Sequence, residues 1–267
     1  MVLAMGVLWR EVLAVLGAGR PALRSVMFAQ IVSWFGRYVP GKLGQVLGKF
    51  WFGRYLGIES RDIAFSLWLE GVFVLGSGTI VVVACLGSSA IAVVGLEAHR
   101  ANKWALIAGA LAVCGAVIWV SFFLIQRLAG RRQSTSSPRV SVPAVGLLLL
   151  GYASTHVCAG LGFYMLLSNM HAGSTDIGIW HAVGVLTAAH LAGIAAVVAP
   201  AGLGAREAAM VLLLAPAMGT APAVTMAVVT RIWATLADIL LVLPLPLLGW
   251  PPRGTGTNGV VAGGVTR

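Results

Sequence analysis

Charged side chains occur inside long apolar stretches of this chain, where a charge is costly. The acidic ones are Glu70, Glu207 and Asp238, and the basic ones are Arg206 and Arg231. An uncompensated Asp, Arg or Lys at the centre of a membrane helix costs about 2.5–3.5 kcal/mol on insertion scales. We therefore expect these charges to be paired or to line a polar cavity.

The basic residues of this set are suited to binding a phosphate group. Arg206 and Arg231 can each present two N–H groups to two phosphate oxygens, and Lys42 adds a compact positive charge. Two alternatives remain open: structural ion pairs that hold a helical bundle together, and a proton relay through the carboxylates. Arg231 and Asp238 are seven residues apart on one helix face, too distant for an ideal direct pair, so each is expected to find a partner on another helix.

Two Pro/Gly sequences interrupt the apolar runs that hold these charges. Residues 39–45 read ValProGlyLysLeuGlyGln, and residues 199–207 read AlaProAlaGlyLeuGlyAlaArgGlu. Broken backbone at membrane depth is tolerated where it is buried in protein or lines a cavity. The residues expected to break the helices are Pro40, Gly41 and Gly44 in the first sequence, and Pro200, Gly202 and Gly204 in the second. A half-helix beginning after Gly204 would direct free N–H groups and its positive dipole end toward an anion.

Each break begins a similar series of residues: a Pro, a Gly, a second Gly, and then one charge inside a long apolar run. The series are Pro40, Gly44, Gly57 and Glu70, and Pro200, Gly204, Gly219 and Arg231. Interrupted segments at corresponding positions in two halves are typical of transporters built from repeats, whose binding site lies at the repeat interface. The pattern predicts an internal repeat that places Glu70 and Arg231 at related positions.

The composition is that of an integral membrane protein. Of the 267 residues, 59% are hydrophobic and 10% are charged, against roughly 25% charged in soluble domains. We predict an all-α polytopic bundle of about 6–8 membrane segments, including two short re-entrant or broken helices. We expect residues 1–249 to form one transmembrane domain and residues 250–267 a flexible tail. The predicted spans are 22–39, 63–86, 104–125, 142–167, 177–198 and 224–248, with 44–56 and 203–217 too short to cross.

The formal net charge of +10 indicates cytoplasmic loops and attraction to anionic lipid headgroups. The basic residues within 37–61 and 127–139 place both regions in the cytoplasm, and this orientation puts the second break near the cytoplasmic face. Nucleic acid is not an expected partner, because the basic residues are scattered between spans.

Motifs for enzyme chemistry are missing from the sequence. There is no GxSxG sequence, no Walker motif and no acidic pair suited to a nucleotide sugar. The cysteines lie in apolar runs, and no His, Cys and Glu spacing indicates a metal site. His156 and His190 are expected to be hydrogen-bonded core residues. We therefore expect a protein that is not an enzyme and binds no metal or cofactor.

From about Trp9 onward the chain resembles the lysylphosphatidylglycerol synthase transmembrane region, or flippase-like, family. The matching pieces are ArgTyrValProGlyLys at 37–42, the turn at Gly57, Glu70, ProAlaGlyLeuGlyAlaArgGlu at 200–207 and ArgIleTrpAlaThrLeuAlaAsp at 231–238. The family pattern has Gly where this chain has Ala201. The resemblance implies a helical bundle with a lipid-facing cavity, which in bifunctional synthases translocates aminoacylated phosphatidylglycerol. We expect no soluble synthase domain within these 267 residues.

The sequence thus predicts a multi-pass protein of the inner cell membrane with lipid flippase-like activity. The expected ligand is a phospholipid or lipid-linked headgroup, anionic or phosphate-bearing. The residues expected to contact it are Lys42, Glu70, Arg206, Glu207, Arg231 and Asp238. The alternative is a non-catalytic scaffold or partner subunit of a membrane enzyme that modifies envelope glycans or lipids.

Overall fold

A computed structural model describes residues 1–39, 43–87, 123, 141–170, 177–196 and 199–250. These residues form helices, turns and short connections, and none of them lies in a strand, so the predicted all-α membrane bundle is confirmed. The elements are α1 (Val2–Val15), α2 (Leu23–Phe35), the 3-10 helix η1 (Gly36–Tyr38), α3 (Leu43–Tyr55), α4 (Ser60–Leu86), α7 (Val142–Met170), α8 (Ile179–Ala195), the 3-10 helix η3 (Pro200–Gly202), α9 (Ala205–Met218), α10 (Thr220–Leu240) and α11 (Leu245–Leu248).

Two long helices agree with predicted spans. α4 has 27 residues and α7 has 29, which gives each a length of about 40 Å or more. They correspond to the predictions at 63–86 and 142–167, and α10 with α11 occupies the predicted span 224–248. In the described part of the chain, four helical stretches are long and apolar enough to cross a membrane. Apart from Phe123, the predicted span 104–125 lies outside the described residues.

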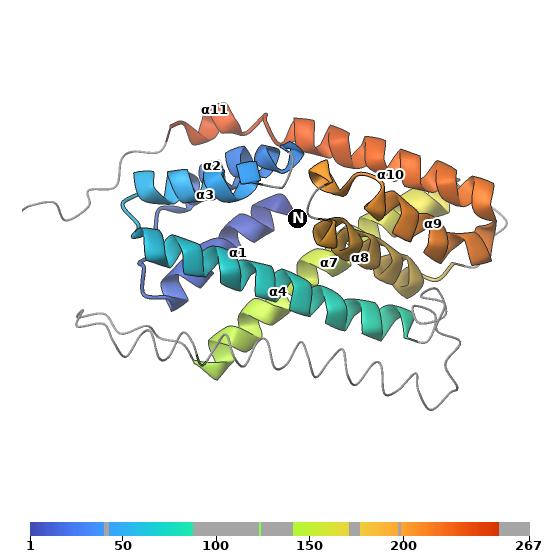
Figure 1. The fold of residues 1–267 in the computed structure, drawn as a ribbon, viewed down its shortest axis with the longest axis horizontal. Coiled ribbons are helices and arrows are strands. Elements are labelled where there is room, and N and C mark those ends of the chain that lie inside the picture. Colours follow the sequence, from blue (N-terminus) through green and yellow to red (C-terminus); the bar gives the residue numbers. More distant parts are fainter. Residues whose placement is uncertain (40–42, 88–122, 124–140, 171–176, 197–198, 251–267) are drawn as a thin grey trace, which may run out of the picture.

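Two other predicted spans, 22–39 and 177–198, are wrong. Each is the first arm of a helical hairpin, in which the chain turns back on itself (Figure 1). The arms are α2 with α3 and α8 with α9, and they contain 13, 13, 17 and 14 residues. A span needs about 20 residues, so α2, α3 and α8 are short for a crossing. In contrast, η3 and α9 together form the apolar stretch Pro200–Met218, whose 19 residues are long enough to cross, although 203–217 was expected to be too short.

Close glycine contacts hold the two arms of each hairpin together. A Cβ atom added at Gly36 would lie 2.1 Å from the carbonyl carbon of Gly44, and one added at Gly202 would lie 2.6 Å from the Cα of Gly193. The backbones therefore touch where each hairpin reverses. Gly204, with a φ of +84°, precedes the first residue of α9. Pro200 begins η3, whereas Pro40 and Gly41 lie outside the described residues.

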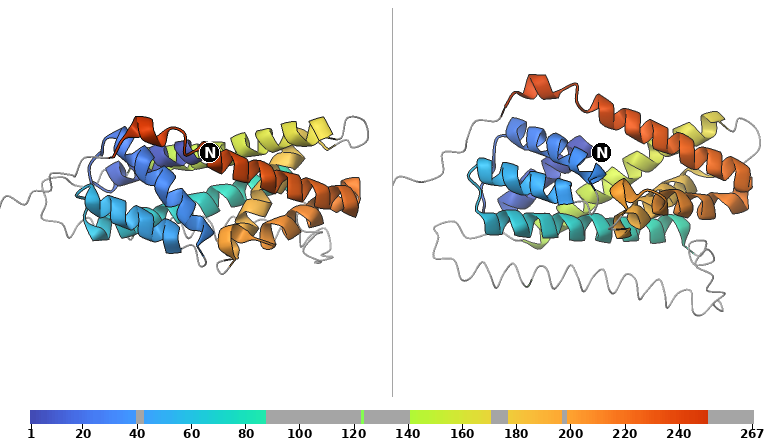
Figure 2. Two further views of the ribbon diagram at one scale, coloured as in Figure 1. Left: turned by 90° about the horizontal axis from the view of Figure 1, so that it is seen from above. Right: turned by 45° about the horizontal axis from the view of Figure 1, so that its top comes forward.

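The two halves repeat one order of elements in opposite directions. In each half a hairpin is followed by a long helix, α4 in the first and α10 in the second, and these two helices run in opposite senses (Figures 1 and 2). The hairpins enter from opposite ends of the molecule. Their tips, η1 and η3, contact each other near its middle. The second break, which was expected near the cytoplasmic face, thus lies near the middle of the molecule.

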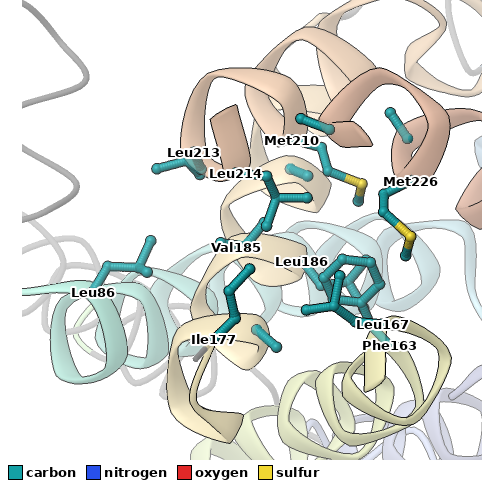
Figure 3. Close-up of a cluster of buried hydrophobic side chains, with 14 residues drawn as sticks. Leu86, Phe163, Leu167, Ile177, Val185, Leu186, Met210, Leu213, Leu214 and Met226 are labelled. Atoms are coloured by element: carbon teal, nitrogen blue, oxygen red, sulfur yellow. The ribbon is translucent and has the colours of Figure 1, made fainter. Parts of the chain in front are cut away.

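Apolar packing fixes the second hairpin in place. Phe163 of α7, Leu186 of α8, Met210 and Leu214 of α9 and Met226 of α10 belong to one buried cluster (Figure 3). Other large apolar side chains face outward, with exposed fractions of 70% or more for Leu147, Leu150 and Leu247. An outer surface of this kind is suited to contact with lipid chains.

The close contact of Gly36 with Gly44 gives a stability prediction. Gly36→Ala should lower the free energy of unfolding by about 1–3 kcal/mol, because the added methyl group overlaps backbone that cannot move aside alone. Thermal unfolding of the purified protein in detergent measures this change. Gly146→Ala in α7 is the matched control, since a Cβ there meets no atom within 4 Å. Equal melting temperatures for the two variants would show that the hairpin does not need this contact.

Candidate functional site

A cavity of about 350 Å³ lies where the two hairpin tips meet. Its lining comes from both hairpins, from α4 and from α1 and α7. Most of the lining is apolar, with a set of convergent polar groups, as in ligand-binding cavities. The polar lining residues are Trp34, Arg37, Gln45, Lys49, Glu70, His156, His190 and Arg206.

The first ion pair joins α3 to α4. Lys49 Nζ lies 2.7 Å and 2.6 Å from the two carboxylate oxygens of Glu70, and their side chains are 1% and 10% exposed. The ammonium group also lies 4.8 Å from the centroid of the Trp9 ring. Such an arrangement satisfies both charges away from water, whereas removing either partner would leave the other uncompensated.

The second ion pair joins the two halves. Asp238 of α10 accepts hydrogen bonds from the Arg37 guanidinium and the Tyr38 hydroxyl (2.6 Å), both in η1, and from Trp34 Nε1 (2.9 Å) in α2. The Arg37 guanidinium carbon lies 4.3 Å from the centroid of the Trp34 ring. Asp238 thereby fixes the tip of the first hairpin against the last long helix.

The third ion pair lies within the second half. The Glu207 carboxylate accepts a hydrogen bond from the Gly204 N–H (2.7 Å), which caps the start of α9, as favoured at a helix N-terminus. Arg231 of α10 lies 3.4 Å from the other Glu207 oxygen and 3.3 Å from the Ala201 carbonyl oxygen. Ala201 holds a φ of +49°, a left-handed conformation that costs a non-glycine residue about 1–2 kcal/mol.

Arg206 differs from these charges. It is the second residue of α9, is half-buried and lines the cavity. Among the described residues, no carboxylate lies within ion-pair distance of its guanidinium. Although Arg206 and Glu207 are adjacent in sequence, Glu207 pairs with Arg231 instead. Among the described residues, the centre of the molecule thus holds four basic side chains and three carboxylates. The basic side chains are Arg37, Lys49, Arg206 and Arg231, and the carboxylates are Glu70, Glu207 and Asp238.

The predicted site residues fall into three groups. Glu70 and Arg206 line the cavity. Glu207, Arg231 and Asp238 lie in the ion pairs around it, so Arg231 and Asp238 each have the partner on another element that their spacing predicted. Lys42 lies outside the described residues.

Glu70 and Arg231, predicted to occupy related positions, lie at similar points of α4 and α10. Their charges are opposite, and they do not pair with each other. Each pairs instead with a residue of its own half's hairpin, Lys49 of α3 and Glu207 of α9 respectively.

Sequence reasoning missed two basic residues of the site. Arg37 and Lys49 were assigned to a cytoplasmic loop, but both line the cavity. A signal was present, because Lys49 lies inside the segment 44–56, which was itself expected to pack within protein. Of the two histidines, His156 is the hydrogen-bonded core residue that was expected. Its Nε2 lies 3.2 Å from the Val74 carbonyl oxygen. Nδ1 of both His156 and His190 is buried with no hydrogen-bond partner among the described residues, and both residues line the cavity.

Comparison with known proteins gives one match. The model of the family described as the lysylphosphatidylglycerol synthase TM region matches residues 1–241. No curated protein and no solved structure matches the chain. The match covers all the helices that carry the three ion pairs and Arg206.

The Lys49–Glu70 pair gives a second stability prediction. Glu70→Gln should lower the free energy of unfolding by about 3–5 kcal/mol, because it leaves a buried ammonium without its counter-charge. The double variant Lys49→Met/Glu70→Gln should recover most of this loss, since no buried charge remains. Thermal unfolding in detergent measures both.

Glu11→Gln is the control for that prediction. It removes the exposed pair of Glu11 with Arg20, whose nitrogen and oxygen lie 2.6 Å apart, and such pairs contribute about 1 kcal/mol or less. A double variant as unstable as Glu70→Gln alone would contradict the assignment of Lys49 and Glu70 as a compensated pair.

Proposed function

Since the chain belongs to the lysylphosphatidylglycerol synthase transmembrane-region family, we propose that it binds the headgroup of a membrane lipid between its hairpin tips and moves that headgroup across the bilayer. The protein is a multi-pass membrane protein. The proposal places it in the inner cell membrane and gives it a transport role without a catalytic one. The ligand is a phospholipid or a lipid-linked headgroup that carries phosphate.

The observation that carries this proposal is the uncompensated Arg206 in a polar cavity at the centre of the bundle. Three carboxylates there are bonded to cations, whereas Arg206 has no carboxylate partner among the described residues. A half-buried cation in such surroundings is stabilised by an anion, and a guanidinium binds two phosphate oxygens at once. A lipid phosphate would supply this counter-charge.

The architecture supports movement of the headgroup alone. A phosphate cannot cross the apolar interior unaided, because its desolvation is too costly. A polar cavity halfway along the bundle shortens the apolar distance that the headgroup must cross. The outward-facing apolar side chains of α7 and α11, such as Leu147, Leu150 and Leu247, leave the acyl chains in contact with the bilayer.

One observation favours the alternative, a scaffold subunit for a membrane enzyme. All three carboxylates beside the cavity are paired, which is what a purely structural core requires. Under this alternative Arg206 would be dispensable for any lipid movement, and the purified protein would move none. The two candidates therefore differ in the behaviour of the isolated protein in vesicles.

Lipid transfer by an Arg206 variant tests the proposal. Purified protein is reconstituted into vesicles containing acyl-labelled phosphatidylglycerol, and chemical quenching of the outer leaflet reports transfer from the inner leaflet. Arg206→Gln should slow transfer about tenfold or more, because a charge-assisted hydrogen bond to the headgroup is lost. The variant should fold normally, since Arg206 has no ion-pair partner among the described residues.

Arg24→Gln serves as the matched control, because Arg24 is exposed and lies outside the cavity lining. It should transfer lipid at the wild-type rate. Equal transfer by wild type and Arg206→Gln would reject a headgroup site at Arg206. No transfer above protein-free vesicles by wild type would favour the scaffold alternative.

A further inference from the structure

We propose that the cavity selects lipid headgroups by charge, accepting a net negative headgroup and disfavouring one that carries an ammonium group. This inference rests on the proposed headgroup-binding function and adds the charge class of the ligand. It concerns phosphatidylethanolamine, phosphatidylcholine and aminoacylated phosphatidylglycerol as disfavoured ligands, and phosphatidylglycerol-type headgroups as favoured ones.

The carboxylates that could receive an ammonium group are already occupied. Both oxygens of Glu70 contact Lys49. Asp238 accepts hydrogen bonds from three side chains of the first hairpin. Glu207 accepts from the Gly204 N–H and from Arg231. An incoming ammonium group would therefore meet carboxylates whose charge a cation of the protein already compensates.

Three aromatic rings at the centre of the bundle already contact cations of the protein. Proteins recognise quaternary and primary ammonium groups on the faces of Trp and Tyr rings. Here the Arg37 guanidinium carbon lies 4.3 Å and 5.2 Å from the centroids of the Trp34 and Tyr38 rings. Lys49 lies over Trp9. Trp34, which lines the cavity, therefore already has a cation of the protein over its ring.

The positive charge that is left without a partner among the described residues favours an anionic ligand. With four cations and three carboxylates in described positions around the cavity, one positive charge is in excess, and Arg206 is the cation without a pair. In low-dielectric surroundings, charges several ångströms apart interact strongly. A phosphodiester without an ammonium group compensates the excess charge. A lysylated headgroup, with two ammonium groups and one phosphate, adds to it.

Binding measurements with lipids of identical acyl chains test the inference. Purified protein in a neutral detergent is titrated with acyl-labelled phosphatidylglycerol, and unlabelled phosphatidylglycerol, phosphatidylethanolamine and lysylphosphatidylglycerol compete for the site. Phosphatidylglycerol should compete at concentrations about tenfold or more below those of the two ammonium-bearing lipids. Arg206→Gln should reduce this preference severalfold, and Arg206→Glu should reverse it.

Arg24→Glu is the control for surface charge and should leave the preference unchanged, because Arg24 is exposed and outside the cavity lining. If Arg206→Glu does not fold, Arg206→Gln decides the question alone. Equal or tighter binding of lysylphosphatidylglycerol by wild type would overturn the inference. So would a preference that survives in Arg206→Gln.

The vesicle assay tests the transport proposal, and the binding competition tests charge selection, so the two can fail separately. If phosphatidylglycerol binds preferentially but no lipid moves in vesicles, the transport proposal fails and charge selection stands. If lipids move irrespective of headgroup charge and no binding preference is found, transport stands and charge selection fails. Absence of binding by every lipid would overturn both.

Discussion

The cost of holding a charge away from water governs the centre of this bundle. Lys49 and Glu70 are nearly inaccessible to solvent, so each requires the other, and their contact fixes α3 against α4. Asp238 requires the donors of η1, and this contact fixes the first hairpin against α10. Glu207 and Arg231 fix α9 against α10 in the same way. Three ion pairs thus set the positions of both hairpins. Glycine contacts bring the two arms of each hairpin close together.

The same arrangement explains why a polar cavity exists where apolar packing would otherwise be expected. Hairpins that enter from opposite ends leave their tips, not their apolar sides, facing each other. Tips expose backbone and polar side chains, so the meeting point is polar even though the surrounding helices are apolar. The polar cavity is therefore a property of the seam between the halves. Neither half contains the whole cavity lining, because Arg37 and Glu70 come from one and His190 and Arg206 from the other.

Length and apolarity alone predicted α4 and α7, because a continuous apolar run of more than 20 residues has few alternatives to a spanning helix. The same criterion failed for 22–39 and 177–198. Their apolar runs are nearly long enough, but whether a chain crosses or turns back at a Gly/Pro break depends on which surface packs against it.

The assignment of Arg37 and Lys49 to a cytoplasmic loop failed for a related reason, since the positive-inside rule assumes that a basic residue outside the apolar runs is in water. Asp238 could be singled out from the sequence, but its partner Arg37 lies 201 residues away, and only the folded chain shows the two together.

That separation has a consequence for how the protein is made. A ribosome adds about 5–20 residues per second, so roughly 10–40 seconds separate the synthesis of Arg37 from that of Asp238. During this interval the first hairpin holds a cation whose carboxylate does not yet exist. Anionic lipid headgroups or water at the membrane surface are the available substitutes. The seam between the halves is therefore the last part of the molecule to be completed, and chains truncated before α10 would expose an uncompensated charge to cellular quality control.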